Sequence, residues 1–321
     1  MTFEDIRDAL EQKKAAFRLT YHHKAKDARQ RYFGNRIAVA GLLAISNYCR
    51  NSCDYCGLRA PNDKIPRYRL SLDEIRLSIN GIRDHGIRRL FLISGEDPGI
   101  AVDDVLKAVE FAAGQGLSVM LGLGVYPRSV YTSMRNVGAE LYALKFETSN
   151  EDIFSSVKPD ISMEERMDAI RDVKEAGLKL GSGNIVGLPG ETVDDIARDI
   201  LLMKELDIDW APVVPYMPAP NTPLGVRQPM GPVDLLLREI ALVRYLIPDS
   251  LITAGQPTQD SKLGFADPDG SRDAINTGAN LLFVDLTPDT RKESFAITQN
   301  RFLPRLEEID RLLIDIGLER E

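Results

Sequence analysis

Apolar runs and helix-like patterns alternate along most of the chain, beginning at Ile37. The apolar runs, several of them rich in β-branched residues, predict strands. We expect eight strands, at Ile37–Ile45, Arg89–Ile93, Ser118–Leu123, Leu141–Phe146, Lys179–Val186, Trp210–Val214, Leu251–Ala254 and Leu281–Val284. The segments that follow them predict helices at Ser71–Asp84, Val102–Gln115, Arg128–Val137, Ser162–Ala176, Val193–Glu205, Val233–Leu246, Arg272–Thr277 and Phe302–Ile316. Eight consecutive β-α units predict an α/β protein with a (β/α)8 TIM-type barrel, and a doubly wound sheet is the alternative.

The first residues differ from this alternation, because Ile6, Leu10 and Phe17 recur at helical spacing with no strand between them. We interpret residues 1–34 as a helical N-terminal cap on the main domain. No Gly/Ser-rich linker separates this segment from the rest of the chain. The sequence therefore predicts a single domain over residues 1–321, with the barrel in residues 35–300 and a closing helix in residues 301–321.

The composition supports a large core and argues against several kinds of partner. Hydrophobic residues make up 44% of the 321 residues. The net charge is −8 and Lys and Arg are spread along the chain, which disfavours nucleic acid or an anionic membrane as the main partner. The N-terminus has no apolar signal region, and no apolar run approaches the roughly 20 residues that span a bilayer. We therefore expect a cytoplasmic protein.

The chain has three cysteines, and all of them lie between positions 49 and 56. Cys49, Cys53 and Cys56 form a C-x3-C-x2-C pattern directly after the first predicted strand. Three thiolates on one short loop can converge on a soft metal centre. A structural zinc site needs four ligands, and His22 and His23 lie far back on a predicted helix, so a [4Fe–4S] cluster with one open iron fits better. The alternative is three free or buried cysteines.

Other polar motifs follow the predicted strands, at the end where a barrel gathers its chemistry. Ser94-Gly95-Glu96-Asp97 follows the second strand, where a glycine permits close approach of a ligand and carboxylates can accept from an ammonium. The alternative is an ordinary acidic loop. Lys145 and Glu147 close the fourth strand, and charges at a buried strand end are costly unless they are paired or used.

Two later segments carry glycines and prolines instead of charges. The run from Gly181 to Glu191 crosses the fifth strand, and glycines inside a strand mark close approach by a ligand or by backbone. It lacks the Gly-Lys-Ser/Thr ending of a phosphate-binding loop. Tyr216 lies in the proline-rich loop from Pro212 to Pro223. This tyrosine either flanks a ligand or packs in the core.

The segment Tyr48-Cys49-Arg50-Asn51-Ser52-Cys53-Asp54-Tyr55-Cys56-Gly57 resembles the signature of the radical S-adenosylmethionine (radical SAM) superfamily. Within it, the chain looks most similar to the group that contains the hydrogenase maturase HydE and the methylornithine synthase PylB, with biotin synthase more distant. The resemblance implies a [4Fe–4S] cluster on Cys49, Cys53 and Cys56, with S-adenosylmethionine (SAM) on the open iron. One electron would then split a C–S bond of SAM and give a 5′-deoxyadenosyl radical that abstracts hydrogen from a small molecule.

The resemblance also implies residues that bind SAM. Arg166 would hold the carboxylate of SAM, and Glu147 would lie beside its sulfonium or ribose. The alternative for Arg166 is a solvated arginine on a helix, and the alternative for Glu147 is a structural ion pair. The full set of residues implied to contact SAM is Tyr55, Ser94, Gly95, Glu96, Glu147, Arg166, Ser182 and Ile185.

Departures from the family pattern appear where the substrate would bind. HydE-like proteins have an arginine at the position of Lys145 and paired threonines after the seventh strand, where this chain reads Thr253-Ala254-Gly255-Gln256-Pro257-Thr258. We expect Lys145, Tyr216, Gln256 and Thr258 to face an anionic or amino-acid-like small molecule, unless Lys145 only pairs with a nearby carboxylate. An electron donor such as flavodoxin or ferredoxin is implied, in an anaerobic cell. A PylB-like amino-acid mutase, an offshoot with its own substrate and a non-catalytic iron–sulfur protein remain open alternatives.

Overall fold

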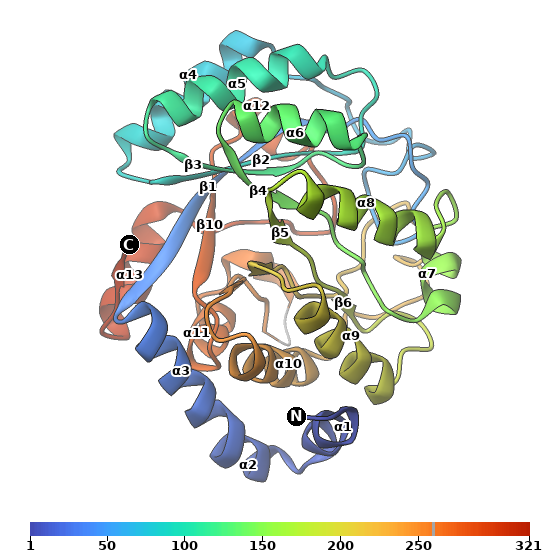
Figure 1. Ribbon diagram of the computed structural model, residues 1–321, viewed down its shortest axis with the longest axis vertical. Helices are drawn as coiled ribbons and strands as arrows, with labels where there is room; N and C mark the ends of the chain where they lie inside the picture. Colours follow the sequence, from blue (N-terminus) through green and yellow to red (C-terminus); the bar gives the residue numbers. More distant parts are fainter. Residues whose placement is uncertain (259–260) are drawn as a thin grey trace.

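Eight parallel strands follow one another around a curled sheet in the computed structural model, which describes residues 1–258 and 261–321 (Figure 1). They are β1 (Arg36–Ser46), β2 (Arg89–Ser94), β3 (Ser118–Gly122), β4 (Ala139–Ala143), β5 (Lys179–Gly181), β7 (Trp210–Ala211), β9 (Leu251–Ile252) and β10 (Leu281–Asp285). Each strand from β1 to β7 pairs with the next in this order, and β10 pairs with β1. A parallel bridge between Thr253 and Leu281 joins β9 to β10. The predicted α/β class and parallel barrel are confirmed.

Two of the predicted strands are interrupted. The fifth splits into β5 and β6 (Ile185–Val186), and the sixth splits into β7 and β8 (Val214–Pro215), with β6 paired to β8 in a separate small sheet. Pro212 has no backbone N–H to give to the ladder at the break. Gly183 packs there so closely that a Cβ would lie 3.3 Å from the Pro212 carbonyl. Ile185, Pro212 and Val214, at this interruption, line the cavity described below.

The helices alternate with the strands and cover the outside of the barrel (Figure 1). They are α4 (Leu72–Asp84), α5 (Val102–Gly114), α6 (Arg128–Asn136), α7 (Glu151–Val157), α8 (Met163–Glu175), α9 (Val193–Glu205), α10 (Val233–Leu246), η2 (Ser261–Ala266), α11 (Pro268–Asn276), α12 (Asp289–Lys292) and α13 (Leu306–Asp315). The predicted capping box from Ser71 to Glu74 opens α4. The helix α11 begins earlier than predicted because the Asp267 side chain caps it and Pro268 is its first residue.

The N-terminal helices lie outside the barrel, against α9 and α10 (Figure 1). They are α1 (Phe3–Glu11), α2 (Lys14–Phe17), η1 (Arg18–His22) and α3 (His23–Phe33), which leads into β1. At the other end of the chain, β11 (Glu319–Arg320) pairs with the start of β1. Among the described residues, no helix combines the length and the apolar character that crossing a membrane requires.

The strand β1 shows how the sequence divides the core into two layers. Its side chains alternate, so Ile37, Val39 and Leu43 pack between the sheet and the helices. The intervening residues form the inner layer and are mostly small: Ala38, Ala40, Leu42 and Ala44. These alanines leave room inside the barrel for three aromatic side chains, Phe91, Trp210 and Phe283, whose ring centroids lie 5.2–5.7 Å apart. The aromatic cluster forms the floor of the cavity described below.

Candidate active site

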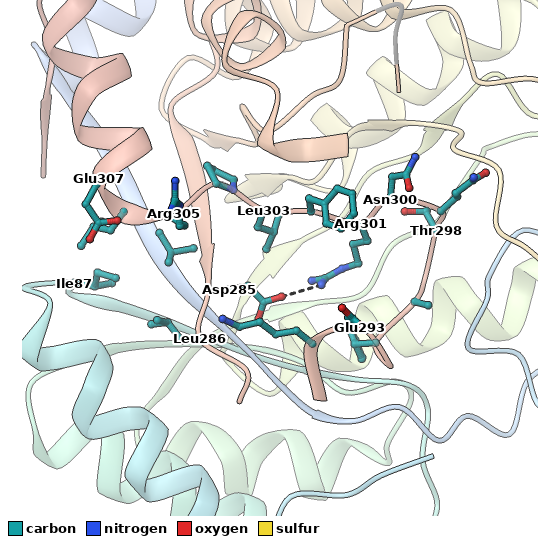
Figure 2. Close-up of a pocket in the computed structure, with 18 of the residues that line it drawn as sticks. Ile87, Asp285, Leu286, Glu293, Thr298, Asn300, Arg301, Leu303, Arg305 and Glu307 are labelled. Atoms are coloured by element: carbon teal, nitrogen blue, oxygen red, sulfur yellow. Dashed lines mark hydrogen bonds and ion pairs between the residues drawn. The ribbon is translucent and has the colours of Figure 1, made fainter. Parts of the chain in front are cut away.

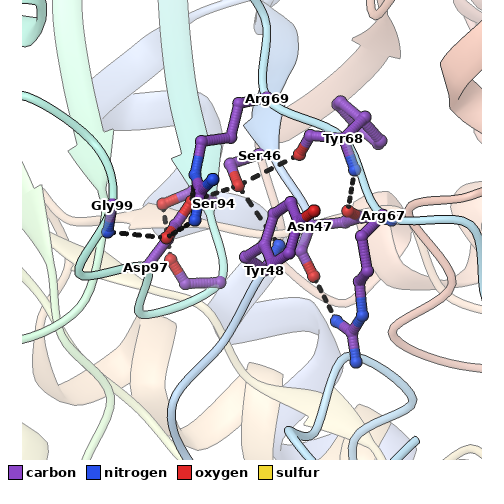
Figure 3. A network of polar contacts seen from close by, with 10 residues as sticks. Ser46, Asn47, Tyr48, Arg67, Tyr68, Arg69, Ser94, Asp97 and Gly99 are labelled. Carbon is purple, nitrogen blue, oxygen red and sulfur yellow. Dashed lines mark hydrogen bonds and ion pairs between the residues drawn. The ribbon is translucent and has the colours of Figure 1, made fainter. Parts of the chain in front are cut away.

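The cysteine loop follows β1 and is held in place by Asn47 and Arg67 (Figure 3). The side-chain amide of Asn47 donates to the carbonyls of Pro66 and Ser294 at 2.7 Å and accepts from the N–H of Tyr68 at 2.7 Å. The guanidinium of Arg67 donates over 2.5–2.9 Å to the carbonyls of Asn47, Leu58, Arg59 and Asn62. These contacts fix the chain on both sides of the cysteines.

Asp97 supports the start of the same loop through a buried carboxylate (Figure 3). It accepts hydrogen bonds from the Ser46 hydroxyl at 2.6 Å, from the Arg69 guanidinium at 2.7 and 2.8 Å, and from the Gly99 N–H at 2.9 Å. Burial alone would raise the pKa of Asp97, but the hydrogen bonds from Arg69 and Ser46 outweigh it and hold the pKa below its usual range. Asp97 therefore stays charged and ties β1 to the loop after β2.

Gly95 lies directly against the cysteine loop. A Cβ at this position would lie 2.1 Å from the Tyr48 carbonyl oxygen and 2.9 Å from the Cys49 Cβ. Its N–H donates to the Ser46 carbonyl at 3.2 Å. Close approach is therefore the reason for a glycine here, as the sequence predicted, but its neighbour in the structure is the cysteine loop itself.

A cavity of about 390 Å³ lies at the C-terminal ends of the strands, above the aromatic floor. Most of the predicted site residues line it, although they come from distant parts of the sequence. These are Cys49, Cys53, Tyr55, Cys56, Ser94, Glu96, Lys145, Glu147, Arg166, Ile185 and Tyr216. The structure thus brings together the predicted metal ligands, most of the predicted SAM residues and two of the predicted substrate residues.

Three other predicted residues lie behind this lining and hydrogen-bond to the protein itself. The Ser182 hydroxyl donates to the Leu144 carbonyl at 2.8 Å. The Gln256 side chain donates to the Val213 carbonyl at 3.1 Å, and the Thr258 N–H donates to the Asp267 carboxylate at 2.8 Å. The structure thus does not bring Ser182, Gln256 and Thr258 to the cavity surface.

Glu147 occupies a strained position at the edge of the cavity. Its φ of 68° lies in the left-handed region that side chains other than glycine rarely adopt, a feature that clusters at functional sites. Its carboxylate lies 3.4 Å from the Lys145 ammonium. Burial raises the pKa of Glu147, but the positive charges of Lys145, Lys158 and Arg166 outweigh it and bring the pKa below its ordinary value. A charged carboxylate therefore faces the cavity.

Arg166 lies on α8 and is only 4% exposed, so it is not a solvated helix arginine. The capping box at Ser162 fixes the start of this helix and thereby the place of Arg166, four residues later, on the cavity wall. Its Nε is buried with no hydrogen-bond partner in the described parts of the chain. A buried guanidinium that lacks a partner is costly, so this position favours an anionic ligand.

Glu96 and Tyr216 both line the cavity, but only the polar group of Glu96 has hydrogen-bond partners among the described residues. The Glu96 carboxylate already accepts from Arg50 Nε at 2.8 Å and from Asn51 Nδ2 at 3.1 Å. Tyr216 packs in an apolar cluster with Ile185, yet its hydroxyl is buried without a partner among the described residues. Tyr216 is therefore a packed aromatic residue that also borders the cavity, and its contact with a ligand stays a prediction.

Comparison with known proteins shows to which family the chain belongs. The family model of the radical SAM superfamily matches residues 43–203, half of the chain. The chain belongs to the radical SAM superfamily. The [FeFe] hydrogenase maturase subunit HydE of Thermotoga maritima is 33% identical to this radical SAM protein over 296 residues, which is 92% of this chain and 83% of the relative.

A second group of radical SAM relatives also matches most of the chain. The 3-methylornithine synthase of Methanosarcina acetivorans is 28% identical over 278 residues, 86% of this chain and 77% of the relative. The crystal structure of methylornithine synthase (PylB) matches with a TM-score of 0.87 at 25% identity, and the match covers 100% of this chain and 94% of that one. The resemblance to the HydE/PylB-like group is confirmed.

Enzymes of this superfamily use a [4Fe–4S] cluster and SAM. The thiols, the guanidinium and the carboxylates that line the cavity suit both of these cofactors. Burial raises the pKa of Cys56 to about 12, so its thiolate needs the positive charge that iron would supply. Within residues 1–258 and 261–321, no three His, Cys, Asp or Glu side chains are grouped to hold a single metal ion. A cluster with its irons at separate corners spreads its thiolates more widely than a single ion does.

Sequence analysis missed Lys158, which follows α7 and lines the same cavity. It is 5% exposed, and its ammonium lies 3.6 Å from the Cys53 sulfur and 3.4 Å from the Tyr55 hydroxyl. In sequence, Lys158 follows a short helix and precedes a proline, and nothing in this pattern distinguishes it from a lysine on the surface. The apolar residues of α7, Ile153, Phe154 and Val157, were the available sign that this helix packs inward.

A second cavity of about 600 Å³ adjoins the first on the outer side of β10 (Figure 2). Arg301 borders both cavities, and its guanidinium lies 3.1 Å from the Asp285 carboxylate. Four residues between Phe295 and α13 border both cavities: Thr298, Arg301, Leu303 and Pro304. This stretch of the chain, before α13, therefore separates the barrel interior from the outer cavity.

Proposed function

We propose that Cys49, Cys53 and Cys56 ligate the [4Fe–4S] cluster and leave one iron open for the amino and carboxylate groups of SAM. The observation that carries this proposal is that the three cysteines share one cavity with the buried Arg166, whose Nε has no hydrogen-bond partner among the residues that the structure describes. Soft thiolates suit iron, and a guanidinium suits a carboxylate. A non-catalytic iron–sulfur protein would need the cysteines but would have no use for such an arginine.

The chemistry that the reduced cluster supplies when bound is the cleavage of one C–S bond of SAM, which yields methionine and a 5′-deoxyadenosyl radical. In our proposal the chain positions SAM for this step. Arg166 binds its carboxylate, and the charged Glu147 lies near its sulfonium or ribose. Tyr55, Ser94 and Ile185 complete the contacts, while Gly95 and Ser182 support them from behind.

The substrate, in this proposal, is a small molecule held between SAM and the aromatic floor. The rings of Phe91, Trp210 and Phe283 favour an apolar body. Lys145 lines the same space and favours an anionic group. A position at the base of the cavity suits radical chemistry, because the target must be held close and water kept out.

We place the reaction closest to the HydE type, with a PylB-like amino-acid mutase as the second candidate. The identity to HydE, at 33%, supports the first, and the TM-score of 0.87 to PylB supports the second. The lysine at position 145 separates this chain from the HydE pattern. An offshoot of this group with its own substrate accounts for that difference as well.

The remaining partner in the proposal is a one-electron donor such as flavodoxin or ferredoxin, because SAM cleavage consumes one electron. A cluster of this kind is oxygen-sensitive, and thiols stay reduced in the cytoplasm, which supports a cytoplasmic location in an anaerobic cell. Nucleic acid has no place in this proposal, since the net charge is −8.

The direct test of the proposal is SAM cleavage by the reconstituted protein. Anaerobic reconstitution with iron and sulfide, followed by reduction with dithionite, should give 5′-deoxyadenosine and methionine from SAM, measured by liquid chromatography. Addition of SAM should also change the electron paramagnetic resonance spectrum of the reduced cluster. A protein that assembles a cluster but neither binds nor cleaves SAM would be the non-catalytic alternative.

Replacing Arg166 with alanine should weaken SAM binding at least tenfold while the cluster still assembles. Each hydrogen bond to a charged group contributes about 1.5–3 kcal/mol, and a factor of ten requires about 1.4 kcal/mol. Isothermal titration of the reconstituted variant with SAM measures the effect. Arg171 on the same helix is the matched control, because its side chain is 62% exposed and pairs with Asp168. Equal SAM affinity of Arg166→Ala and Arg171→Ala would remove Arg166 from the site.

A further inference from the structure

The segment after α7 is fastened to the cysteine loop at several points. The Asp54 N–H donates to the Val157 carbonyl at 2.9 Å. The Ser52 hydroxyl donates to the two carboxylate oxygens of Asp160 at 2.9 and 2.8 Å. Lys158 lies between these two anchors, so its position relative to Cys53 is fixed by the backbone as well as by its own side chain.

The Lys158 ammonium is directed at the cysteine loop. Its Nζ lies 3.6 Å from the Cys53 sulfur, 3.4 Å from the Tyr55 hydroxyl and 5.9 Å from the centre of the Tyr55 ring. The side chain is buried, at 5% exposure of the residue. An ammonium has three N–H donors and no acceptor, so it can donate to both the sulfur and the phenol.

Lys158 forms no salt bridge within the described residues. Its charge acts at longer range on Glu147 and on Cys56. A buried ammonium without a carboxylate partner is costly unless another negative group compensates it. Three thiolates around a [4Fe–4S] core carry a net negative charge, and that charge grows by one when the core is reduced.

We propose that Lys158 raises the reduction potential of the cluster by hydrogen-bonding to the Cys53 sulfur and by placing a buried positive charge beside it. Hydrogen bonds to ligand sulfurs and nearby charge are two of the factors that set such potentials. The positive charge stabilises the reduced, more negative form more than the oxidised form. Lys158 thereby eases electron entry from a donor. The inference rests on the proposed assignment of the three cysteines as cluster ligands.

The test is the midpoint potential of the reconstituted protein, measured without SAM by titration monitored with electron paramagnetic resonance. Lys158→Met should lower the equilibrium constant for one-electron reduction at least tenfold, which corresponds to 59 mV. Lys158→Arg keeps the charge and should retain most of the wild-type potential. Lys64→Met is the control, because this lysine has a side chain that is 67% exposed and pairs with Asp63. Its potential should equal that of the wild type.

This experiment distinguishes failure of the cluster-ligand assignment from failure of the role proposed for Lys158. Wild-type protein that assembles no cluster would overturn the ligand assignment before any potential is compared. A cluster with the same potential in wild type and Lys158→Met would overturn the role of Lys158 alone, as would an unchanged potential accompanied by weaker SAM binding. If the methionine variant does not assemble a cluster, Lys158→Gln decides the matter, because it keeps an N–H donor without the charge and should also shift the potential downward.

Discussion

Replacing Cys53 with alanine will abolish cluster assembly and SAM cleavage together. Cys53 is the central residue of the C-x3-C-x2-C motif and is 7% exposed beside the cavity. The chain has three cysteines, so no other thiol can replace it. A cluster held by two thiolates loses a ligand that its charge and geometry require. Iron and sulfide analysis of the reconstituted variant, together with its absorption spectrum, measures the first loss, and 5′-deoxyadenosine formation measures the second.

The control for this variant is Ser52→Ala. Ser52 precedes Cys53 and its hydroxyl binds Asp160, so its removal perturbs the same loop but leaves the three thiols intact. Ser52→Ala should therefore assemble one cluster per chain. Wild-type iron content or full SAM cleavage in Cys53→Ala would contradict the ligand assignment, provided that circular dichroism shows both variants to be folded.

The barrel could be predicted because buried parallel strands are continuous apolar runs in sequence. All eight predicted strands correspond to strands of the structure. The errors are local and have local causes. The fifth and sixth strands break where Gly183 and Pro212 meet, since proline cannot extend the hydrogen-bond ladder. The last helix begins at Leu306 and not at Phe302, because residues 302 to 305 pass along the cavities before the helix starts.

The candidate site was predictable where one short motif carries it and less so elsewhere. The cysteine spacing identifies the metal ligands without any three-dimensional information. Lys158 carries no such signal, because its significance lies in a 3.6 Å contact with a residue 105 positions earlier in the chain. Asp97 is similar, since its hydrogen bonds from Ser46 and Arg69 join segments that are distant in the sequence.

Residue type predicted which chemical groups a side chain offers better than it predicted whether that side chain points into the cavity. Gln256 was expected to face the substrate because it offers a donor and an acceptor, but its amide donates to the Val213 carbonyl in the wall. Ser182 likewise binds the Leu144 carbonyl. Ser182 lies in the strand that breaks after Gly181, and Gln256 lies in the loop after β9, so no regular strand alternation fixes the direction of either side chain.

Replacing Lys145 with methionine will remove the stimulation of SAM cleavage by substrate and leave slow, uncoupled cleavage unchanged. The Lys145 ammonium donates to the Asn184 carbonyl at 2.9 Å and lies 3.4 Å from Glu147. Burial lowers the pKa of Lys145, and the neighbouring Glu147 opposes that effect. Two of the three ammonium donors are thus directed at protein groups, and the side chain lines the cavity, so one donor remains for an anionic substrate.

The assay compares small carboxylates, amino acids and their neutral amides as stimulants of 5′-deoxyadenosine formation. A carboxylate that stimulates the wild type should have no effect on Lys145→Met, and its neutral amide should stimulate neither protein. Lys145→Arg is the matched control, because it keeps the charge and should keep the response. SAM affinity distinguishes the alternative: if Lys145 serves only to neutralise Glu147, the methionine variant will leave that carboxylate buried and unpaired and will lose SAM binding itself. Loss of SAM binding, or stimulation equal to that of the wild type, would therefore rule out Lys145 as the residue that recognises the substrate.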